Sequence, residues 1–263
     1  MSLLWVALVL GVVEGLTEFL PVSSTGHLIL AGHLMGFVGP RADLFEVFIQ
    51  LGAILAVVWE YRVRLLRVVA SLPSRPEARR FASAVVLAFA PAAALGFLTH
   101  DWIEDVLFSP RTVAFALITG AGAILLVEAL PLRARTHDAE TISWGQALLV
   151  GLAQCVSLWP GFSRSAATIL GGLLSGLDRR AATEFSFFLA IPVMAAASVF
   201  SLAKHLDDLQ PGDAWALALA FVLSFLVAWA SIRWLLWFVA THRFRPFAWY
   251  RLALGLLVLW LMR

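Results

Sequence analysis

The sequence predicts an all-α integral membrane protein with six transmembrane helices and two re-entrant helical hairpins, arranged as an inverted-topology repeat. Three observations predict this fold. Apolar residues make up 61% of the 263 residues and charged residues only 14%, whereas about a quarter of a soluble domain is charged. The apolar residues form blocks close to the ~20 residues that a crossing needs. Two of these blocks are interrupted near their middle by a short run of proline, serine and glycine, a combination that ends a helix.

Six apolar stretches predict full crossings. They are about Leu44 to Trp59, Phe81 to Leu98, Thr112 to Leu130, Ala182 to Leu202, Trp215 to Val239 and Trp249 to Leu261. The connections between them alternate in charge: residues 60–80 hold six arginines, and residues 101–109 hold Asp101, Glu104 and Asp105. The positive-inside bias therefore places the first connection in the cytoplasm and the second outside. The same bias places the loop with Asp207, Asp208 and Asp213 outside.

Two further apolar stretches, Leu3 to Met35 and Ser143 to Gly176, predict hairpins that do not cross. Arginines precede and follow the second stretch, so both of its ends lie in the cytoplasm. It is broken by Trp159-Pro160-Gly161-Phe162-Ser163, and the first stretch is broken by Pro21-Val22-Ser23-Ser24-Thr25-Gly26. One crossing separates the first hairpin from the cytoplasmic connection at residues 60–80, so the ends of this hairpin lie outside.

The chain reads as a single membrane domain, 1–263, whose two halves, 1–131 and 143–263, resemble each other. The segment Ala7-Leu8-Val9-Leu10-Gly11 recurs as Ala147-Leu148-Leu149-Val150-Gly151. The break follows each copy, and each half holds one broken hairpin and three crossings. An odd number of crossings inverts the second copy, and in such repeats the broken helices meet near the midplane and form the site.

Glu14 and Glu18 predict a divalent-cation site in the first hairpin. Four residues apart, they lie on one face of a helix. Carboxylates inside an apolar segment are costly and usually functional. Their hard oxygens suit Mg²⁺ or Ca²⁺, with phosphate oxygens and water completing the shell. The alternative is that Glu14 is simply solvated near the membrane interface.

The residues after the first break predict an anion-binding helix N-terminus. Ser23, Ser24 and Thr25 open the returning half-helix, where hydroxyls cap free N–H groups and the remaining donors bind phosphate. His27 follows this cap and the two carboxylates, which favours a catalytic role. The alternative is a core histidine whose hydrogen bonds are satisfied.

The second break predicts the other half of the same site. Gly161 makes the turn, Ser163, Ser165 and Thr168 supply three hydroxyls, and Arg164 lies at membrane depth, where a charge is costly. The planar fork of arginine suits bidentate phosphate binding. The alternative is a purely structural ion pair with Glu14 or Glu18. The two breaks together predict a buried phosphate-ester site.

Both motifs resemble the signature motifs of the undecaprenyl-diphosphate phosphatase family of the bacitracin-resistance type. They are the segment from Glu14 to His27 and Pro160-Gly161-Phe162-Ser163-Arg164-Ser165-Ala166-Ala167-Thr168. The similarity covers essentially the whole chain. It implies hydrolysis of a long polyprenyl diphosphate to its monophosphate, which recycles the lipid carrier for peptidoglycan synthesis and confers bacitracin resistance. It also implies a divalent metal and a bacterial inner-membrane location, with the active site opening to the periplasmic or outer face.

The resemblance also implies a role for each motif residue. Glu14 and Glu18 would serve the metal or the attacking water, and Ser24 and His27 the reacting phosphorus. The remaining residues would bind the substrate and its diphosphate oxygens: Arg164, Ser163, Ser165, Thr168, Ser23, Thr25 and Gly161. Glu18, Ser24, His27 and Arg164 are the residues predicted to be catalytic.

The expected partners are the prenyl diphosphate substrate and membrane lipids. Nucleic acid is not expected, because the net charge is only +2 and the basic residues are scattered. The sequence leaves open whether the chain forms a homodimer, and whether the attacking group is His27, Ser24 or a water activated by Glu18. It also leaves open a different function, a transporter or flippase for an anionic lipid, because transporters share the inverted-repeat plan.

Overall fold

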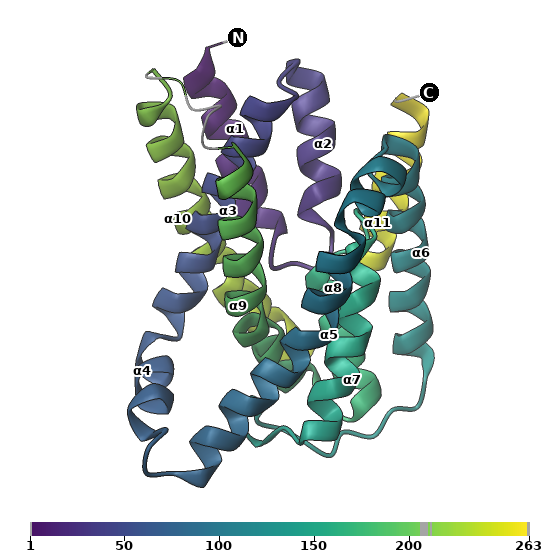
Figure 1. The fold of residues 1–263 in the computed structure, drawn as a ribbon. Coiled ribbons are helices and arrows are strands. Elements are labelled where there is room, and N and C mark those ends of the chain that lie inside the picture. Colours follow the sequence, from purple (N-terminus) through teal and green to yellow (C-terminus); the bar gives the residue numbers. More distant parts are fainter. Residues whose placement is uncertain (1, 206–209, 211, 262–263) are drawn as a thin grey trace.

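The structure, a computed structural model, describes residues 2–205, 210 and 212–261. The described residues form a bundle of helices (Figure 1), and they contain no β-sheet beyond an isolated bridge between Thr136 and Leu177. The elements in chain order are α1 Leu3–Thr17, α2 Ser24–Met35, α3 Pro40–Glu60, α4 Arg62–Ser71, α5 Pro76–Leu107, α6 Pro110–Ala129, η1 Ala139–Thr141, α7 Trp144–Gln154, η2 Cys155–Leu158, α8 Arg164–Ser175, α9 Arg179–His205, α10 Ala214–Thr241 and α11 Arg245–Leu261.

Five helices within the described residues are long and apolar enough to cross a membrane: α3, α5, α6, α9 and α10. The all-helical fold is confirmed, and the five apolar helices are consistent with a multi-pass membrane protein. The last predicted crossing corresponds to α11, which has 17 residues. The full arrangement of six crossings and two re-entrant hairpins stays a prediction.

The helices extend beyond the apolar blocks that predicted them. The connection expected at residues 101–109 is helical up to Leu107, because α5 continues through the acidic residues and ends only before the Ser109 capping box of α6. The connection expected at residues 60–80 contains α4. An apolar block marks where the hydrocarbon ends, whereas a helix continues until a cap ends it, and α5 and α9 continue even through Pro91 and Pro192. Asp207 and Asp208 lie outside the described residues.

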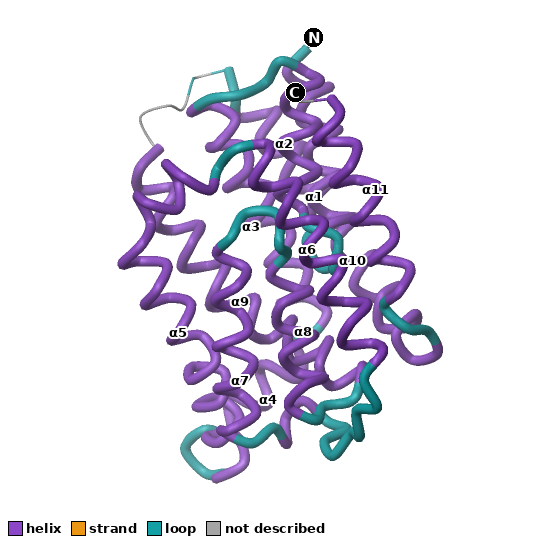
Figure 2. The backbone as a smooth tube through the Cα atoms, turned by 90° about the vertical axis from the view of Figure 1, so that its right-hand side faces the viewer, coloured by secondary structure: helices purple, strands orange, loops and turns teal. Residues whose placement is uncertain are grey.

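Two helix pairs turn back inside the bundle. One turn joins α1 to α2 and the other joins η2 to α8, and both lie at mid-height among the helices (Figures 1 and 2). Ser23 and Ser163 occupy equivalent places in the two turns, with φ of 72° and 77°, the positive-φ non-glycine residues of the described chain. Each caps the helix that follows: Gly26 N–H donates to Ser23 Oγ at 3.3 Å, and Ala166 N–H donates to Ser163 Oγ at 3.2 Å.

The helices before the two turns pack in matching ways. A Cβ atom on Gly11 of α1 would lie 2.6 Å from the carbonyl oxygen of Ala220 in α10, and one on Gly151 of α7 would lie 2.5 Å from that of Ala88 in α5. Glycine is therefore needed at both places for two helix backbones to meet. Gly151 follows Gly11 at the same interval as Ser163 follows Ser23. The same interval pairs Glu14 with Gln154 and Ser24 with Arg164.

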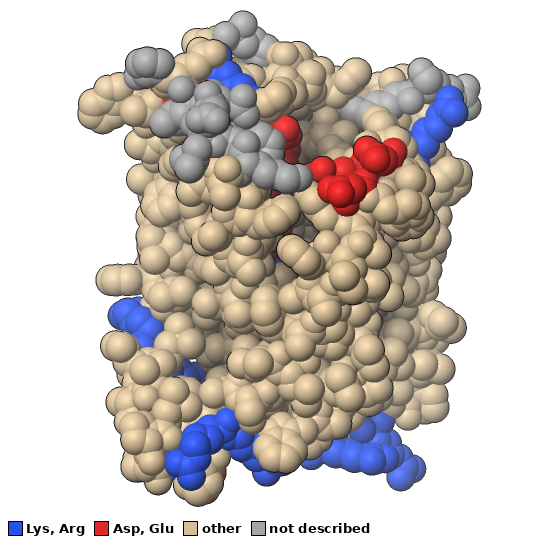
Figure 3. All heavy atoms as spheres, in the orientation of Figure 1, with Lys and Arg blue, Asp and Glu red and all other residues tan. Residues whose placement is uncertain are grey.

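Charge is unevenly distributed along the bundle. On the face shown in Figure 3, most basic side chains lie at the end that holds α4 and α7 in Figure 1, and the acidic side chains lie toward the end that holds the two termini. Between the two ends this face shows few charged side chains, as a membrane protein requires.

Candidate active site

The two turns are bonded directly to each other. Ser165 Oγ, from the second turn, donates to the carbonyl oxygen of Leu20 in the first turn at 2.8 Å. Arg164 Nη2 lies 3.2 Å from Glu18 Oε1, which makes an ion pair between the same two segments. The prediction that the two breaks form one site is consistent with these contacts.

Arg251 of α11 holds both turns against α6. Its side chain is fully buried, and its guanidinium donates to the carbonyl oxygens of Leu117 and Pro21, each at 3.3 Å, and of Ala116 and Gly161, each at 3.2 Å. Pro21 and Gly161 belong to the first and the second turn. A Cβ atom on Gly120 of α6 would overlap Arg251 Nη2, so a larger residue there would displace this guanidinium.

Arg251 was not predicted from the sequence. The residue lies inside the predicted crossing from Trp249 to Leu261, and a single arginine there did not interrupt the apolar pattern. A signal was present, because the cost of a charge at membrane depth, which singled out Arg164, applies equally to Arg251.

Ser24, Glu18 and Arg164 form a continuous polar chain. Ser24 Oγ donates to Glu18 Oε2 at 2.5 Å, and Glu18 Oε1 accepts from Arg164 Nη2. Arg164 Nη1 in turn donates to the carbonyl oxygen of Ser186 in α9 at 3.1 Å. Glu18 is only 9% exposed. A hydroxyl next to a carboxylate that a third group orients is the arrangement of an activated nucleophile.

Two buried polar atoms at this site have no hydrogen-bond partner in the structure. They are Glu14 Oε2 and Arg164 Nε. An unsatisfied buried polar group costs about 1–3 kcal/mol, and such groups in a native protein call for an explanation such as an ion or a ligand. Glu14 is 2% exposed, so it is not solvated at the interface. One orphaned acceptor and one orphaned donor suit a cation and an anion respectively.

His27 stands at the start of α2 with partners for both ring nitrogens. Nδ1 lies 2.7 Å from the carbonyl oxygen of Ser23, so this nitrogen carries the proton, and Nε2 accepts from the Tyr250 hydroxyl at 2.6 Å. The two rings stack with centroids 5.5 Å apart. Its predicted catalytic role stays a prediction. Tyr250 was missed, and no signal marked it, because aromatic residues near a membrane interface are common.

The other predicted residues lie in the two turns and at the starts of α2 and α8. Ser163 Oγ and Ser165 Oγ are 2.9 Å apart, and Thr168 Oγ1 lies 2.7 Å from Ser186 Oγ. Gly161 has a φ of 97°, and Thr25 is half-buried in the first turn of α2. These contacts hold the turns in place, and contact of the same residues with substrate stays a prediction.

The protein side chains alone offer few metal ligands. No group of three or more His, Cys, Asp or Glu residues that could hold a metal occurs within residues 2–205, 210 and 212–261. Glu18 uses one oxygen for Ser24 and the other for Arg164, whereas Glu14 keeps one oxygen unpaired. A site built on these two carboxylates therefore needs substrate oxygens and water, a mode that is usual for Mg²⁺.

Comparison with known proteins extends over nearly the whole chain. The family model described as "Bacitracin resistance protein BacA" matches residues 7–257. The chain is 54% identical over 253 residues to "Undecaprenyl-diphosphatase" of Ectopseudomonas mendocina (strain ymp), covering 96% of this chain and 92% of that protein. It is 54% identical over 258 residues to "Undecaprenyl-diphosphatase 1" of Paraburkholderia xenovorans (strain LB400), covering 96% and 93%. It is 52% identical over 253 residues to "Undecaprenyl-diphosphatase" of Pseudomonas putida (strain GB-1), covering 96% and 92%. The chain belongs to the bacitracin resistance protein BacA family.

Proposed function

We propose that this protein is an undecaprenyl-diphosphatase, which hydrolyses undecaprenyl diphosphate to undecaprenyl phosphate and inorganic phosphate. The reaction returns the lipid carrier to peptidoglycan synthesis and confers bacitracin resistance. The names of relatives more than half identical over 96% of the chain support this assignment. The structural observation that carries it is the Ser24–Glu18–Arg164 chain at the meeting point of two helix N-termini.

The geometry favours Ser24 as the attacking group. Its hydroxyl already donates to Glu18 Oε2, so Glu18 is in place to take the proton as Ser24 Oγ attacks the terminal phosphorus. A bond forms between Ser24 Oγ and phosphorus as the bridging P–O bond breaks, and the lipid monophosphate leaves with the electron pair. Water then attacks the phosphoserine, and the Ser24–phosphorus bond breaks. Ser24 Oγ regains its proton, and inorganic phosphate leaves.

Arg164 and the two helix ends stabilise the charge on the diphosphate. Phosphoryl transfer depends mainly on positioning and charge stabilisation. The unpaired Nε of Arg164 supplies a donor for a phosphate oxygen. Free N–H groups at the starts of α2 and α8 add donors and the positive ends of two helix dipoles. Ser23, Thr25, Gly161, Ser163, Ser165 and Thr168 complete the proposed contacts of the turns with the substrate.

Glu14 and Glu18 are the residues that would hold a divalent cation, Mg²⁺ or Ca²⁺. The unpaired buried oxygen of Glu14 supports this proposal, as does the preference of such cations for carboxylate oxygen. When bound, the cation would neutralise charge on the diphosphate oxygens.

We further propose six crossings, with the hairpins α1–α2 and α7–α8 entering the membrane from opposite sides, in a single domain that repeats at 1–131 and 143–263. The matching glycine contacts of α1 and α7 support the repeat. The uneven charge of the two ends supports an orientation with α4 in the cytoplasm. In that orientation the protein lies in the bacterial inner membrane among membrane lipids, and its site opens to the periplasmic face.

A transporter or flippase is not favoured, because the relatives are named as phosphatases. The decisive assay incubates the purified protein with undecaprenyl diphosphate in detergent and measures phosphate release. We expect release that Ser24→Ala and Glu18→Gln abolish, and a phosphorylated protein that maps to Ser24. Absence of release from the folded wild-type protein overturns the function. Incorporation of solvent oxygen without any protein adduct assigns the attack to water instead of Ser24.

A further inference from the structure

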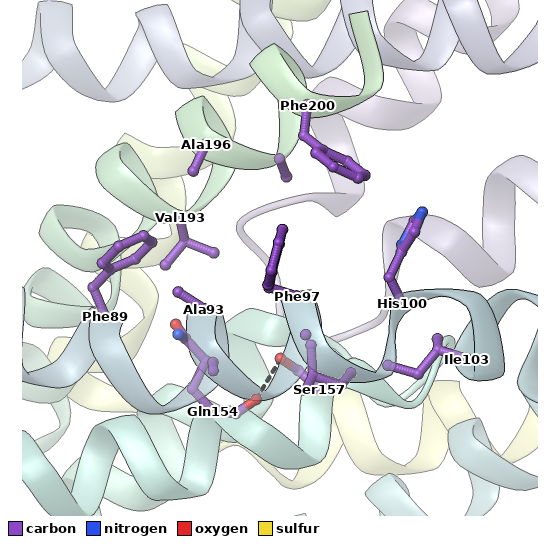
Figure 4. Close-up of a pocket in the computed structure, with 14 residues that line it drawn as sticks. Phe89, Ala93, Phe97, His100, Ile103, Gln154, Ser157, Val193, Ala196 and Phe200 are labelled. Carbon is purple, nitrogen blue, oxygen red and sulfur yellow. Dashed lines mark hydrogen bonds between the residues drawn. The ribbon is translucent and has the colours of Figure 1, made fainter. Parts of the chain in front are cut away.

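An apolar groove opens beside the second turn, between α5, α9 and the end of α7 with η2 (Figure 4). Its volume is about 420 Å³, and Phe89, Phe97, Val193 and Phe200 form much of its wall. On α5 the lining runs from Phe89 to Ile103, which spans about 21 Å of helix. Phe97 is 77% exposed and Phe200 42%, so the groove is open on the side that faces lipid.

The groove continues the proposed active site along α9. Ser186 contacts both Arg164 and Thr168. Val193 lies two helical turns further along the same face of α9, about 10 Å from Ser186. The groove begins there and runs toward the end of α9 that holds Phe200. A linear molecule whose phosphate lies against Arg164 can therefore place its next part in the groove.

The inner end of the groove holds a polar side chain without a partner. Gln154 is 1% exposed, and neither its Nε2 nor its Oε1 has a hydrogen-bond partner in the structure. Figure 4 shows the Gln154 amide directed into the cavity beside Ala93 and Val193. An orphaned amide in an apolar wall is costly unless a ligand or water satisfies it.

We propose that this groove binds the part of the prenyl chain nearest the diphosphate, with Gln154 at the end where the chain joins its polar head. This inference rests on the diphosphatase function proposed above. A cavity of this size matches a small-molecule pocket, so it holds only part of a C55 chain. The remainder of the chain leaves through the open side past Phe97 into the bilayer.

Filling the groove tests the proposal. Ala93→Phe and Ala197→Phe introduce a ring at two lining positions. Ala94→Phe and Val199→Phe are matched controls, because they introduce the same ring on the same helices at exposed positions that do not line the groove. Phosphate release is measured with undecaprenyl diphosphate (C55) and isopentenyl diphosphate (C5). The C5 chain is too short to fill a groove that begins about 10 Å beyond Ser186.

We expect the filling variants to raise KM for the C55 substrate at least about tenfold, since contact with a single methylene is worth about that much. Their kcat, their kinetics with the C5 substrate and both control variants should stay within about twofold of the wild type. An unchanged KM for C55 overturns the inference, and so does an equal loss with both substrates. These outcomes differ from failure of the proposed function, in which the wild type releases phosphate from neither substrate.

Cross-linking supplies a readout that does not depend on turnover. A prenyl diphosphate with a diazirine on its first isoprene units should label α5 and α9 at the groove, and undecaprenyl diphosphate should compete with the label. Labelling that excess phospholipid displaces and undecaprenyl diphosphate does not would assign the groove to a membrane lipid and refute the proposal. Gln154→Met keeps the volume and removes the amide. We expect it to raise KM for C55 and to leave KM for C5 within about twofold of the wild type. An unchanged KM for C55 would show that Gln154 does not contact the prenyl chain.

Discussion

Replacing Arg251 with methionine tests whether one buried side chain holds the two turns together. Methionine keeps an unbranched chain of similar length and removes all four hydrogen bonds to backbone carbonyls. Ala116 and Leu117 lie inside α6, where helix hydrogen bonds still serve their carbonyls. Pro21 and Gly161 lie in the turns, outside any helix, so their carbonyls lose the partner that Arg251 supplies.

The expected loss of folding free energy in Arg251→Met follows from the Pro21 and Gly161 carbonyls. Leaving each one unsatisfied and buried costs about 1–3 kcal/mol, or about 2–6 kcal/mol for the pair. Removing the buried charge offsets part of this cost, so we expect a net loss in the lower half of that range. A loss of about 2 kcal/mol lowers Tm by at least about 4 °C in a protein of this size. A shift of 1 Å between the turns would also reduce kcat about 100-fold.

Thermal unfolding in detergent and phosphate release measure the two effects. Arg233→Met is the matched control, because Arg233 is an exposed arginine on α10 whose guanidinium lies 5.4 Å from the Trp229 ring. The control should keep a Tm within about 2 °C of the wild type. If Arg251→Met has the same Tm as the Arg233→Met control and hydrolyses substrate at the wild-type rate, other contacts hold the two turns together and Arg251 does not.

Four further substitutions probe the site. Arg164→Lys keeps the charge and loses the guanidinium that joins Glu18, Ser186 and the proposed phosphate contact, so kcat for phosphate release should fall by about 10²–10³. Near-normal turnover would show that the charge alone is sufficient. Glu14→Gln should raise the Mg²⁺ concentration for half-maximal activity by at least about tenfold, and an unchanged Mg²⁺ titration would remove Glu14 from the cation site. Tyr250→Phe removes one hydrogen bond and keeps the stacked ring, so kcat should drop about two- to tenfold; an unaltered kcat would make that bond irrelevant to turnover. Gly161→Ala places a Cβ atom 2.6 Å from a backbone oxygen at a φ of +97°, so the variant should lose about 1–3 kcal/mol of stability in thermal unfolding. Gly145→Ala is the control, because its Cβ atom would meet no atom within 4 Å. Equal Tm values for the two variants would show that Gly161→Ala causes no strain.

The sequence predicts the helices better than their ends. Apolar length locates α3, α6, α9 and α10 because each helix begins and ends within about four residues of its apolar block. It fails at the end of α5, where Asp101 and Glu104 are polar yet helical. Hydropathy reports the surroundings of a residue, whereas helix length depends on caps and prolines.

The sequence predicts only those residues of the candidate site that belong to a local motif. Local motifs point to Glu18, Ser24 and Arg164, because their spacing relative to the two breaks is visible in the sequence. Arg251 and Tyr250 come from α11 and reach the turns only through the tertiary packing of α11 on α6. Contacts of this kind join residues far apart in the chain, and no local pattern encodes them.

Arg251 also constrains the order in which the protein matures. Its guanidinium lies on α11, while one turn that it fastens directly follows α1. During synthesis the first hairpin is therefore made long before α11, the helix that supplies its arginine partner. Until α11 docks, the Pro21 carbonyl lacks its arginine partner, and a nascent chain stalled before that helix should be an early target for quality-control proteolysis.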